Sequence, residues 1–369
     1  MWLVIVLFCA VLILGVTENA VLKRRIDRIP VRILVNGTRG KSSVTRMLTA
    51  ALNGCGIRAF GKTTGSEARF ILPDLSEEEV PRKRGIRMVR EHDIMFKKAI
   101  EHECQAIVCE CMAIREESQK IIGDKLFRPT ITVITNARVD HVDQMGDTEE
   151  ETAEVLCRSI GESETVFTCD PVIAEALRGR ECEVRITEKL PEECRLHTEK
   201  FCFPVHEENL AVVLEVCRSL GLGDEDVLNA VVKTEPDSGM TADMEIGGHL
   251  VVNGFASNDI VSARRLLEGR DMKDVTVIYN NRSDREFRLK MFRSLFEEAG
   301  VTDLTVIGDN VNKCRRYFAK ALGYDAVREG CGQPDADIGM SRRTIVCMGN
   351  IKGAGQALLQ YCADRNREA

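Results

Sequence analysis

Aromatic residues are scarce in this chain, because phenylalanine, tryptophan and tyrosine make up only 5 % of its 369 residues. The core must therefore be mostly aliphatic. A net positive charge is also missing, since 58 acidic residues outnumber 51 basic ones and give a formal charge of −7. This balance argues against a general nucleic-acid binder, which is usually basic, but leaves room for local basic pockets that bind anionic substrates. With 44 % apolar and 30 % charged residues, the chain is typical of a folded globular protein with two domains.

No C-x-x-C pair occurs among the fifteen cysteines. An odd count in so long a chain argues against a small secreted disulfide scaffold. Cys104, Cys109 and Cys111 form the tightest group, and on a strand the last two would share a face, which leaves a soft-metal site open. Buried free thiols behave as small hydrophobic side chains, so we expect a reduced, cytoplasmic protein instead.

The first sixteen residues carry no charge. Extended to Leu22, this apolar run reaches the length of about 20 residues that a membrane-spanning helix needs. The basic cluster at residues 23–25 follows the run, whereas a cleaved signal peptide carries its positive charge before it. The positive-inside rule then leaves the catalytic domains in the cytoplasm. We expect a single-pass membrane anchor over residues 1–22; the alternative is a buried N-terminal strand or helix.

Beyond residue 30, apolar runs of strand length alternate with amphipathic segments of helix length. Near-continuous apolar strands are expected where helices cover both faces of a parallel sheet. The turn-rich stretch 236–239 interrupts the alternation, which then restarts on a smaller scale. We predict an α/β fold with a central domain at residues 23–238, built on a parallel sheet, and a smaller Rossmann-like α/β domain at residues 239–369. The predicted strands are VRILVN, AIVCEC, ITVITN, TVFTC and EVRIT, then HLVVNGF, DVTVIYN, DLTVIGD and RTIVCMGN.

The segment NGTRGKSS joins the first predicted strand to the first predicted helix. Glycines in such a turn let successive backbone N–H groups surround an anion, and the helix adds its positive dipole end. Lys41 would reach the β- and γ-phosphates of a nucleotide, and Ser42 would ligate Mg²⁺. Val35 stands where the full P-loop pattern has its first glycine, so the strand–turn–helix context carries the prediction. The predicted phosphate-binding residues of this P-loop domain are Gly37, Thr38, Arg39, Gly40, Lys41, Ser42 and Ser43.

Two further strand ends are expected beside this turn, because ligands bind at the carboxyl ends of strands in open α/β sheets. The strand AIVCE ends at Glu110. The strand ITVITN ends at Asn136 and is followed by Asp140, His141 and Asp143. Carboxylate and imidazole groups there would hold Mg²⁺ against the phosphates. We therefore expect Glu110, Asn136 and His141 to share one site with the turn.

Taken together, these motifs resemble those of the Mur ligase family. GTRGKS is similar to the family's ATP-binding turn, and VCECMA to the segment that carries its Mg²⁺-binding glutamate, here Glu110. TNARVDHVDQMG resembles the Asp-His segment, with His141 as a second metal ligand. HEENLAVVLEVCRSLG resembles the helix whose asparagine, here Asn209, approaches the nucleotide. Within the family, the apolar anchor and GKTTGSEAR (residues 61–69) resemble the ligase subunits of poly-γ-glutamate synthases.

The resemblance, which covers residues 31–355, implies an ATP-dependent ligase. Such an enzyme activates a carboxylate as an acyl phosphate, which an incoming amine then attacks, with Lys41, Glu110 and His141 as the catalytic residues here. Both reactants would be glutamate-like anions joined in γ-linkage, so cationic contacts are required. The expected substrate-binding residues are Lys62, Thr63, Thr64, Arg69, Arg282 and Arg285. The smaller domain would close over the first.

The resemblance also implies partners. One short apolar segment cannot form a channel, so membrane subunits of a synthase and export complex are expected beside the growing poly-γ-glutamate chain. No nucleic-acid partner is expected, and a homo-oligomer is left open.

Two features depart from the family's pattern. Members that build peptidoglycan carry a domain for a uridine-nucleotide substrate before the phosphate turn, where this chain has only the anchor and a short link, which disfavours that substrate class. Leu156 stands where many members have a carbamylated lysine, so a second metal site is assembled differently or absent. Three alternatives stay open: a folylpolyglutamate-synthase-like ligase, a membrane-tethered NTPase that energises export, and a non-catalytic scaffold.

Overall fold

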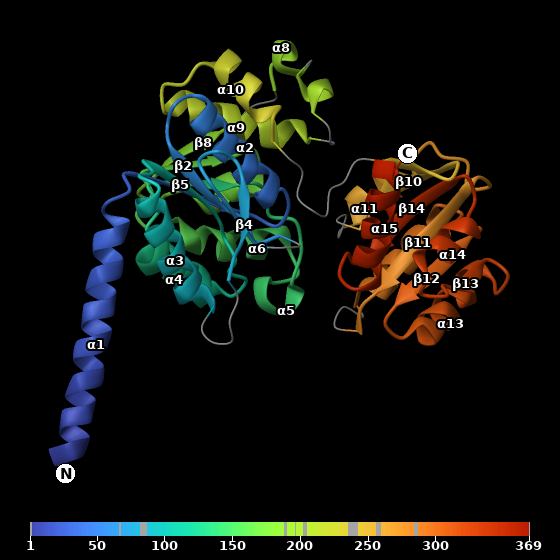
Figure 1. Ribbon diagram of the computed structural model, residues 1–369, viewed down its shortest axis with the longest axis horizontal. Coiled ribbons are helices and arrows are strands. Elements are labelled where there is room, and N and C mark those ends of the chain that lie inside the picture. Colours follow the sequence, from blue (N-terminus) through green and yellow to red (C-terminus); the bar gives the residue numbers. More distant parts are fainter. Residues whose placement is uncertain are drawn as a thin grey trace. The chain divides into compact units, whose positions relative to one another are not determined.

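The chain forms two α/β units, Met1–Glu235 and Pro236–Ala369, each built around its own sheet (Figure 1). We refer to them as the N-terminal and the C-terminal unit. The computed structural model describes residues 2–65, 68–81, 87–187, 190–195, 197–201, 205–234, 243–255, 260–283 and 287–368. The predicted α/β fold class is confirmed, while the predicted boundary at residues 236–239 lies outside the described residues.

The apolar N-terminus is a continuous helix, α1 (Trp2–Ile26), which is long and apolar enough to cross a membrane. The apolar side chains of residues 2–21 are exposed, so the alternative of a buried N-terminal element does not apply to this stretch. The helix runs four residues past the predicted end at Leu22, and Leu22, Ile26 and the following Ile29 lie in the core of the N-terminal unit. The last turns of α1 are therefore part of the folded unit.

The described residues of the N-terminal unit form an eight-stranded sheet of order β4-β3-β2-β5-β1-β6-β7-β8. Its central strands pair in parallel and are buried on both faces, which explains their near-continuous apolar sequences. The short strands β3 and β4 pair antiparallel at one edge and were not predicted. The strands are β1 (Val31–Asn36), β2 (Ala59–Lys62), β3 (Arg69–Ile71), β4 (Glu77–Glu79), β5 (Ala106–Glu110), β6 (Ile131–Ile134), β7 (Thr165–Thr168) and β8 (Glu183–Ile186).

Helices cover both faces of this sheet (Figure 1). Helix α2 packs against α9 and α10, while α3 packs against α1 and contributes Met95 and Phe96 to a core cluster with Phe60 and Phe70 of the sheet. The remaining helices are short connections. The helical segments are α2 (Lys41–Gly54), α3 (Arg87–Glu101), α4 (Glu116–Ile121), the π-helical η1 (Ile122–Phe127), α5 (Val142–Met145), α6 (Glu149–Leu156), the 3₁₀ turns η2 (Cys157–Ile160) and η3 (Thr198–Lys200), α7 (Pro171–Ala176), α8 (Glu192–Arg195), α9 (Glu207–Ser219) and α10 (Asp224–Val231).

In the C-terminal unit, the residues that the structure describes form a six-stranded sheet of order β13-β12-β11-β14-β10-β9, parallel except for β9. Helices α11, α12 and α13 pack on one face, and α14 and α15 on the other, as in a Rossmann-like fold. The strands are β9 (Met244–Ile246), β10 (His249–Asn253), β11 (Val275–Asn281), β12 (Leu304–Gly308), β13 (Val327–Glu329) and β14 (Thr344–Gly349). The helices are α11 (Ile260–Leu267), α12 (Phe287–Glu298), α13 (Val311–Leu322), α14 (Pro334–Gly339) and α15 (Ala354–Glu368).

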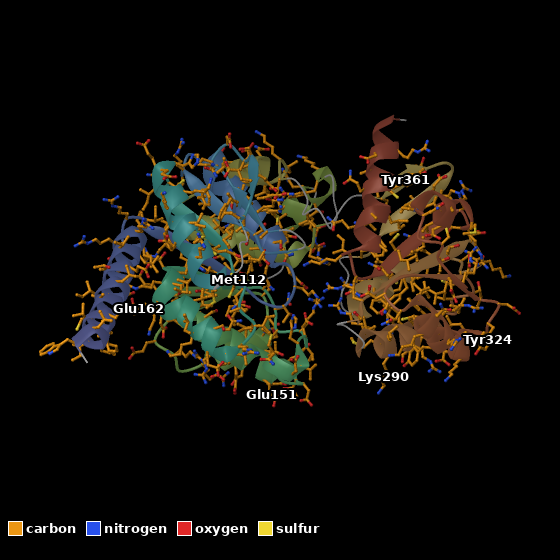
Figure 2. All side chains as sticks on the ribbon, turned by 60° about the horizontal axis from the view of Figure 1, so that its bottom comes forward. Met112, Glu151, Glu162, Lys290, Tyr324 and Tyr361 are labelled. Atoms are coloured by element: carbon orange, nitrogen blue, oxygen red, sulfur yellow. The ribbon has the colours of Figure 1, made fainter. Side chains whose placement is uncertain are left out.

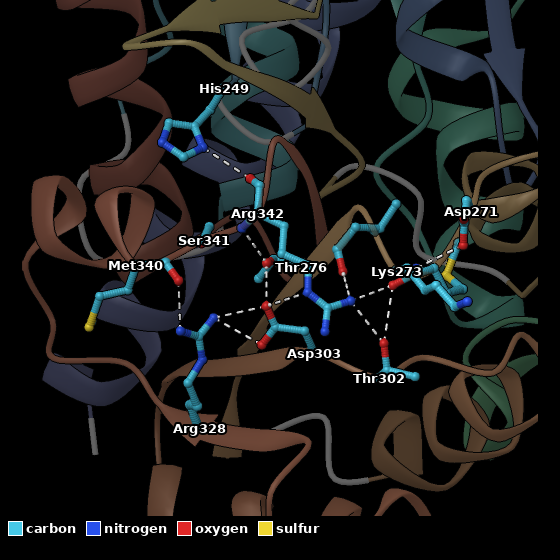
Figure 3. A network of polar contacts seen from close by, with 12 residues as sticks. His249, Asp271, Lys273, Thr276, Thr302, Asp303, Arg328, Met340, Ser341 and Arg342 are labelled. Carbon is cyan, nitrogen blue, oxygen red and sulfur yellow. Dashed lines mark hydrogen bonds and ion pairs between the residues drawn. The ribbon is translucent and has the colours of Figure 1, made fainter.

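A network of side chains ties together the amino ends of the strands in the C-terminal unit (Figure 3). Asp303, just before β12, accepts hydrogen bonds from Thr276 on β11 at 2.5 Å and from Arg328 on β13 at 3.1 Å. Arg342, just before β14, lies 3.5 Å from the same carboxylate. These bonds occupy one end of the sheet, opposite the carboxyl ends where ligands bind in such folds.

Candidate active site

The turn between β1 and α2 depends on two glycines. Gly37 and Gly40 have φ of 125° and 82°, conformations that side chains rarely adopt. A Cβ at Gly37 would lie 2.1 Å from Thr135 Oγ1, and one at Gly40 would lie 2.7 Å from Asn209 Oδ1. The turn thus has room for backbone alone, and α9 brings Asn209 against it.

Asn136, which follows β6, holds this turn in place. Its Oδ1 accepts hydrogen bonds from Thr38 Oγ1 at 2.7 Å and from the Arg39 backbone N–H at 3.1 Å. Its Nδ2 donates to the Arg39 carbonyl at 3.1 Å. The structure therefore places this predicted nucleotide-binding residue beside the turn, with its amide bonded to the turn backbone.

Lys41 and the start of α2 form an anion-binding geometry. Gly40 is the N-cap residue of the helix and, as a glycine, offers no side-chain hydrogen bond to the first backbone N–H groups of α2. The Lys41 ammonium donates to the Gly37 carbonyl at 2.6 Å and is thereby folded over the turn. Ser43 lies in the same first helical turn.

Ser42 and Glu110 meet beside the turn, although 68 positions separate them in the chain. The Ser42 hydroxyl donates to Glu110 Oε2 at 2.9 Å, and the Thr64 backbone N–H donates to the same oxygen at 2.7 Å. Glu110 is only 3 % exposed, so its carboxylate is held in one position at the carboxyl end of β5.

These two side chains fit a magnesium site. Mg²⁺ prefers oxygen ligands and is usually held by one or two carboxylates together with phosphates and waters, and a hydroxyl beside a carboxylate provides that donor set. Within the described ranges, no three His, Cys, Asp or Glu side chains come close enough to bind a metal ion. The role of His141 as a second metal ligand thus stays a prediction.

His141 lies at the start of α5 with a φ of 49°. Its neighbour Asp140 pairs with Arg39 of the phosphate turn at 2.9 Å. Burial opposes ionisation of Asp140, but the charges of Arg39 and His141 outweigh it and hold the pKa of the carboxyl below its usual range. The Asp-His segment is therefore attached to the phosphate turn through Arg39.

The predicted substrate residues fall into different environments. Lys62 is fully buried on β2, where its ammonium lies 3.2 Å from the carboxylate of Glu91 on α3, so the structure does not present it to solvent. Thr63 is buried as well, and its backbone N–H donates to the Arg69 carbonyl at 2.9 Å. Thr64 contacts Glu110, as described above.

The predicted substrate-binding arginines are divided between the two units. Arg69 is partly exposed on β3 and lies 4.0 Å from Glu79. Arg282 follows β11 in the C-terminal unit, and Arg285 lies outside the described residues.

Sequence reasoning missed Glu91 as the partner of Lys62. One signal was present, because Glu91 falls between Met88 and Met95 at the spacing of the apolar face of α3. A carboxylate on an apolar face needs a buried cation.

Cys109 and Cys111 lie in the core cluster between the sheet and α3, where burial raises the pKa of their thiols to about 12 and about 11.

Comparison with known proteins supplies an independent view. Residues 35–180 match the Mur ligase middle domain, and residues 243–365 match the poly-gamma-glutamate synthase CapB C-terminal domain. PGA synthase CapB of Bacillus subtilis is 30 % identical over 98 % of this chain and 97 % of its own length. Capsule biosynthesis protein CapB of Bacillus anthracis is 30 % identical over 94 % of this chain and 80 % of its own.

Solved structures share the fold at lower identity. E. coli FolC in complex with ADP has a TM-score of 0.69 at 13 % identity and covers 94 % of this chain and 93 % of its own. Mycobacterium tuberculosis folylpolyglutamate synthase, complexed with ADP and AMPPCP, has a TM-score of 0.67 at 14 % identity. The match covers 94 % of this chain and 95 % of the synthase chain. These two proteins, both solved with a bound nucleotide, thus share the fold of this chain.

Proposed function

This chain belongs to the CapB family of poly-γ-glutamate synthases, and we propose that its N-terminal unit uses ATP to activate a glutamate carboxylate for γ-linked amide formation. It is an ATP-dependent acid–amino acid ligase. The observation that carries the proposed site is the contact of Ser42 with Glu110 beside a glycine turn that opens a helix.

The chemistry has two steps. An oxygen of the substrate carboxylate attacks the γ-phosphorus of ATP, and ADP leaves with the electrons of the broken P–O bond. The amine of the second glutamate unit then attacks the carbonyl carbon of the acyl phosphate, loses a proton and expels inorganic phosphate. Phosphoryl transfer of this kind needs positioning and cancellation of negative charge more than covalent help from the protein.

The residues of the turn perform the positioning. Backbone N–H groups of residues 37–43 hold the phosphates, and Lys41 moves from the Gly37 carbonyl to the β- and γ-phosphates when ATP binds. Ser42 and Glu110 are the residues that would hold Mg²⁺, which when bound supplies positive charge against the phosphate oxygens. Asn136 fixes the turn, and Asn209 lies against Gly40, where the nucleotide enters.

The substrate contacts follow from charge. Arg69, close to Thr63 and Thr64, is proposed to bind a glutamate carboxylate at the N-terminal unit, with Arg282 and Arg285 as the cations of the C-terminal unit. His141 is proposed as a second metal ligand near Arg39. Lys62 is buried in an ion pair with Glu91 and is proposed to fix the start of the segment in which Thr64 contacts Glu110.

Helix α1 supports a membrane location. Its exposed apolar face is long enough to span a bilayer, and Lys23, Arg24 and Arg25 in its last turn would lie on the cytoplasmic side. Membrane subunits that take over the growing anionic polymer are the proposed partners.

The test uses membranes that contain the full chain with its partner subunits. We expect glutamate-dependent release of ADP together with a new amide product, and loss of both in Lys41→Met. ADP release that ignores glutamate would instead identify an export NTPase, and a folate acceptor preferred over glutamate would identify a folylpolyglutamate-type ligase. If Lys41→Met still supported synthesis of the amide product, the chain would act as a non-catalytic scaffold.

A further inference from the structure

A groove of about 640 Å³ lies along α13 in the C-terminal unit. Leu289 of α12 and Tyr317 of α13 line its apolar part, and Lys313, Arg316 and Lys320 line its polar part. The volume is within the range of about 300–1,000 Å³ that is usual for ligand sites. None of the described residues that line it carries a carboxylate.

The cations of this groove form one stripe. Lys313, Arg316 and Lys320 follow each other at i, i+3 and i+7, so they share a face of α13 and span about 10 Å along the helix. All three are exposed. Within the part of the chain that the structure describes, Arg316 and Lys320 make no ion pair, and Glu329 on the neighbouring strand pairs instead with Arg315 at 3.7 Å.

Further cations border the stripe on α12. The Arg293 guanidinium lies over the Tyr317 ring at 5.0 Å, which joins the two helices and adds positive charge at the groove. Lys290 lies one turn earlier on α12 and is exposed at the surface of the C-terminal unit (Figure 2). In a chain with a net charge of −7, this concentration of cations creates a local positive potential that attracts an extended anion.

We propose that this groove, the α13 groove, is a binding site for the poly-γ-glutamate product, separate from the phosphate turn. The proposal rests on the proposed function, which makes a polymer with one carboxylate on every residue. A row of carboxylates complements a row of ammonium and guanidinium groups, and Leu289 and Tyr317 pack against the methylene carbons between them. A site that retains the chain between additions raises its effective concentration at the enzyme and favours long products.

Binding is tested with the full chain in detergent and fluorescently labelled poly-γ-glutamate. The variant Lys313→Gln/Arg316→Gln/Lys320→Gln is compared with Arg265→Gln/Lys273→Gln/Arg343→Gln, which removes the same charge from exposed positions outside the groove. We expect the groove variant to bind about tenfold more weakly and the control to bind like the original chain. Equal weakening in both variants, or equal binding of a polynucleotide of similar length, would mean non-specific charge attraction and overturn the site.

Product length provides the second measurement. In membranes with partner subunits, the groove variant is expected to keep glutamate-dependent ADP release and to make shorter chains. If the original chain makes no polymer, the proposed function fails, and the binding experiment still reports on the groove. If the original chain makes polymer and the groove variant matches it in both affinity and product length, the groove proposal fails alone.

Discussion

Ser42, in the first turn of α2, donates a hydrogen bond of 2.9 Å to Glu110 at the carboxyl end of β5. The bond joins α2, the helix that follows the phosphate turn, to β5. Strand β5 pairs directly with β1, the strand that precedes the turn. If this pair holds Mg²⁺ as proposed, the hydroxyl and the carboxylate are already side by side, so neither of these two side chains must be reorganised when the nucleotide arrives.

Glu110→Gln tests this pair. The amide keeps the size of the side chain but removes the negative charge, so we expect ADP release to fall by about 10²–10³-fold with the fold intact. Nucleotide binding with and without Mg²⁺ is measured alongside. Glu154→Gln, an exposed carboxylate on α6, is the matched control, and equal activity of both variants would contradict the role of Glu110.

Gly40→Ala tests the tight turn. A Cβ there meets the Asn209 amide at 2.7 Å, and a φ of 82° costs about 1–2 kcal/mol for a residue with a side chain. Gly56→Ala is the control, because Gly56 has a φ of 86° and open space around it. We expect Gly40→Ala alone to weaken ATP binding in a fluorescence titration, and Asn209→Ala to restore part of it in the double variant.

Lys62→Met tests the buried ion pair. Glu91, only 2 % exposed, would lose the cation at 3.2 Å, so we expect the free energy of unfolding to fall by about 3–5 kcal/mol in urea titrations. The double variant Lys62→Met/Glu91→Gln should recover most of the lost free energy of unfolding, because it leaves no unpaired buried carboxylate. A stable Lys62→Met variant with a raised KM for glutamate would instead support a substrate contact for this lysine.

The buried imidazole of His92 should make the free energy of unfolding depend on pH. Burial, followed by the charge of Lys62, lowers the pKa of His92 to about 3, whereas an unfolded histidine titrates near about 6.5. Between these values the unfolded chain binds more protons, so stability falls as the pH drops below about 6.5, by up to about 1.4 kcal/mol per pH unit.

Urea unfolding at about pH 7 and about pH 5 checks this expectation. In His92→Phe, which keeps a ring against Phe127, this share of the pH dependence should vanish. An unchanged pH dependence would show that other groups cause it.

Truncation of α1 tests how the anchor is attached. Removing residues 2–17 takes away exposed apolar surface only, so the chain should leave the membrane fraction and keep its thermal stability. Removing residues 2–29 also deletes Leu22, Ile26 and Ile29 from the core and should cost about 1.5–3 kcal/mol for each. Sedimentation and thermal unfolding separate the two effects, and equal stability of both truncations would place the end of α1 outside the fold.

Several parts of the site were accessible from the sequence because they are local. The glycine turn, the strand before it and the helix after it occupy adjacent positions. Apolar runs identified β1, β5, β6 and β7, because burial on both faces leaves no polar alternation, but β2, which is buried and only four residues long, was not predicted. The edge strands β3 and β4 escaped prediction, since three residues are too few to show a period.

What the sequence by itself determined is the α/β class, from the alternation of apolar runs with amphipathic segments, and the glycine turn between β1 and α2, because both follow from neighbouring residues. Only the tertiary structure decided that Ser42 meets Glu110, that Asn209 lies against Gly40 and that Lys62 is buried with Glu91. The physical reason is that periodicity shows which face of an element is buried, whereas its partner depends on the register and crossing of elements far apart in the chain.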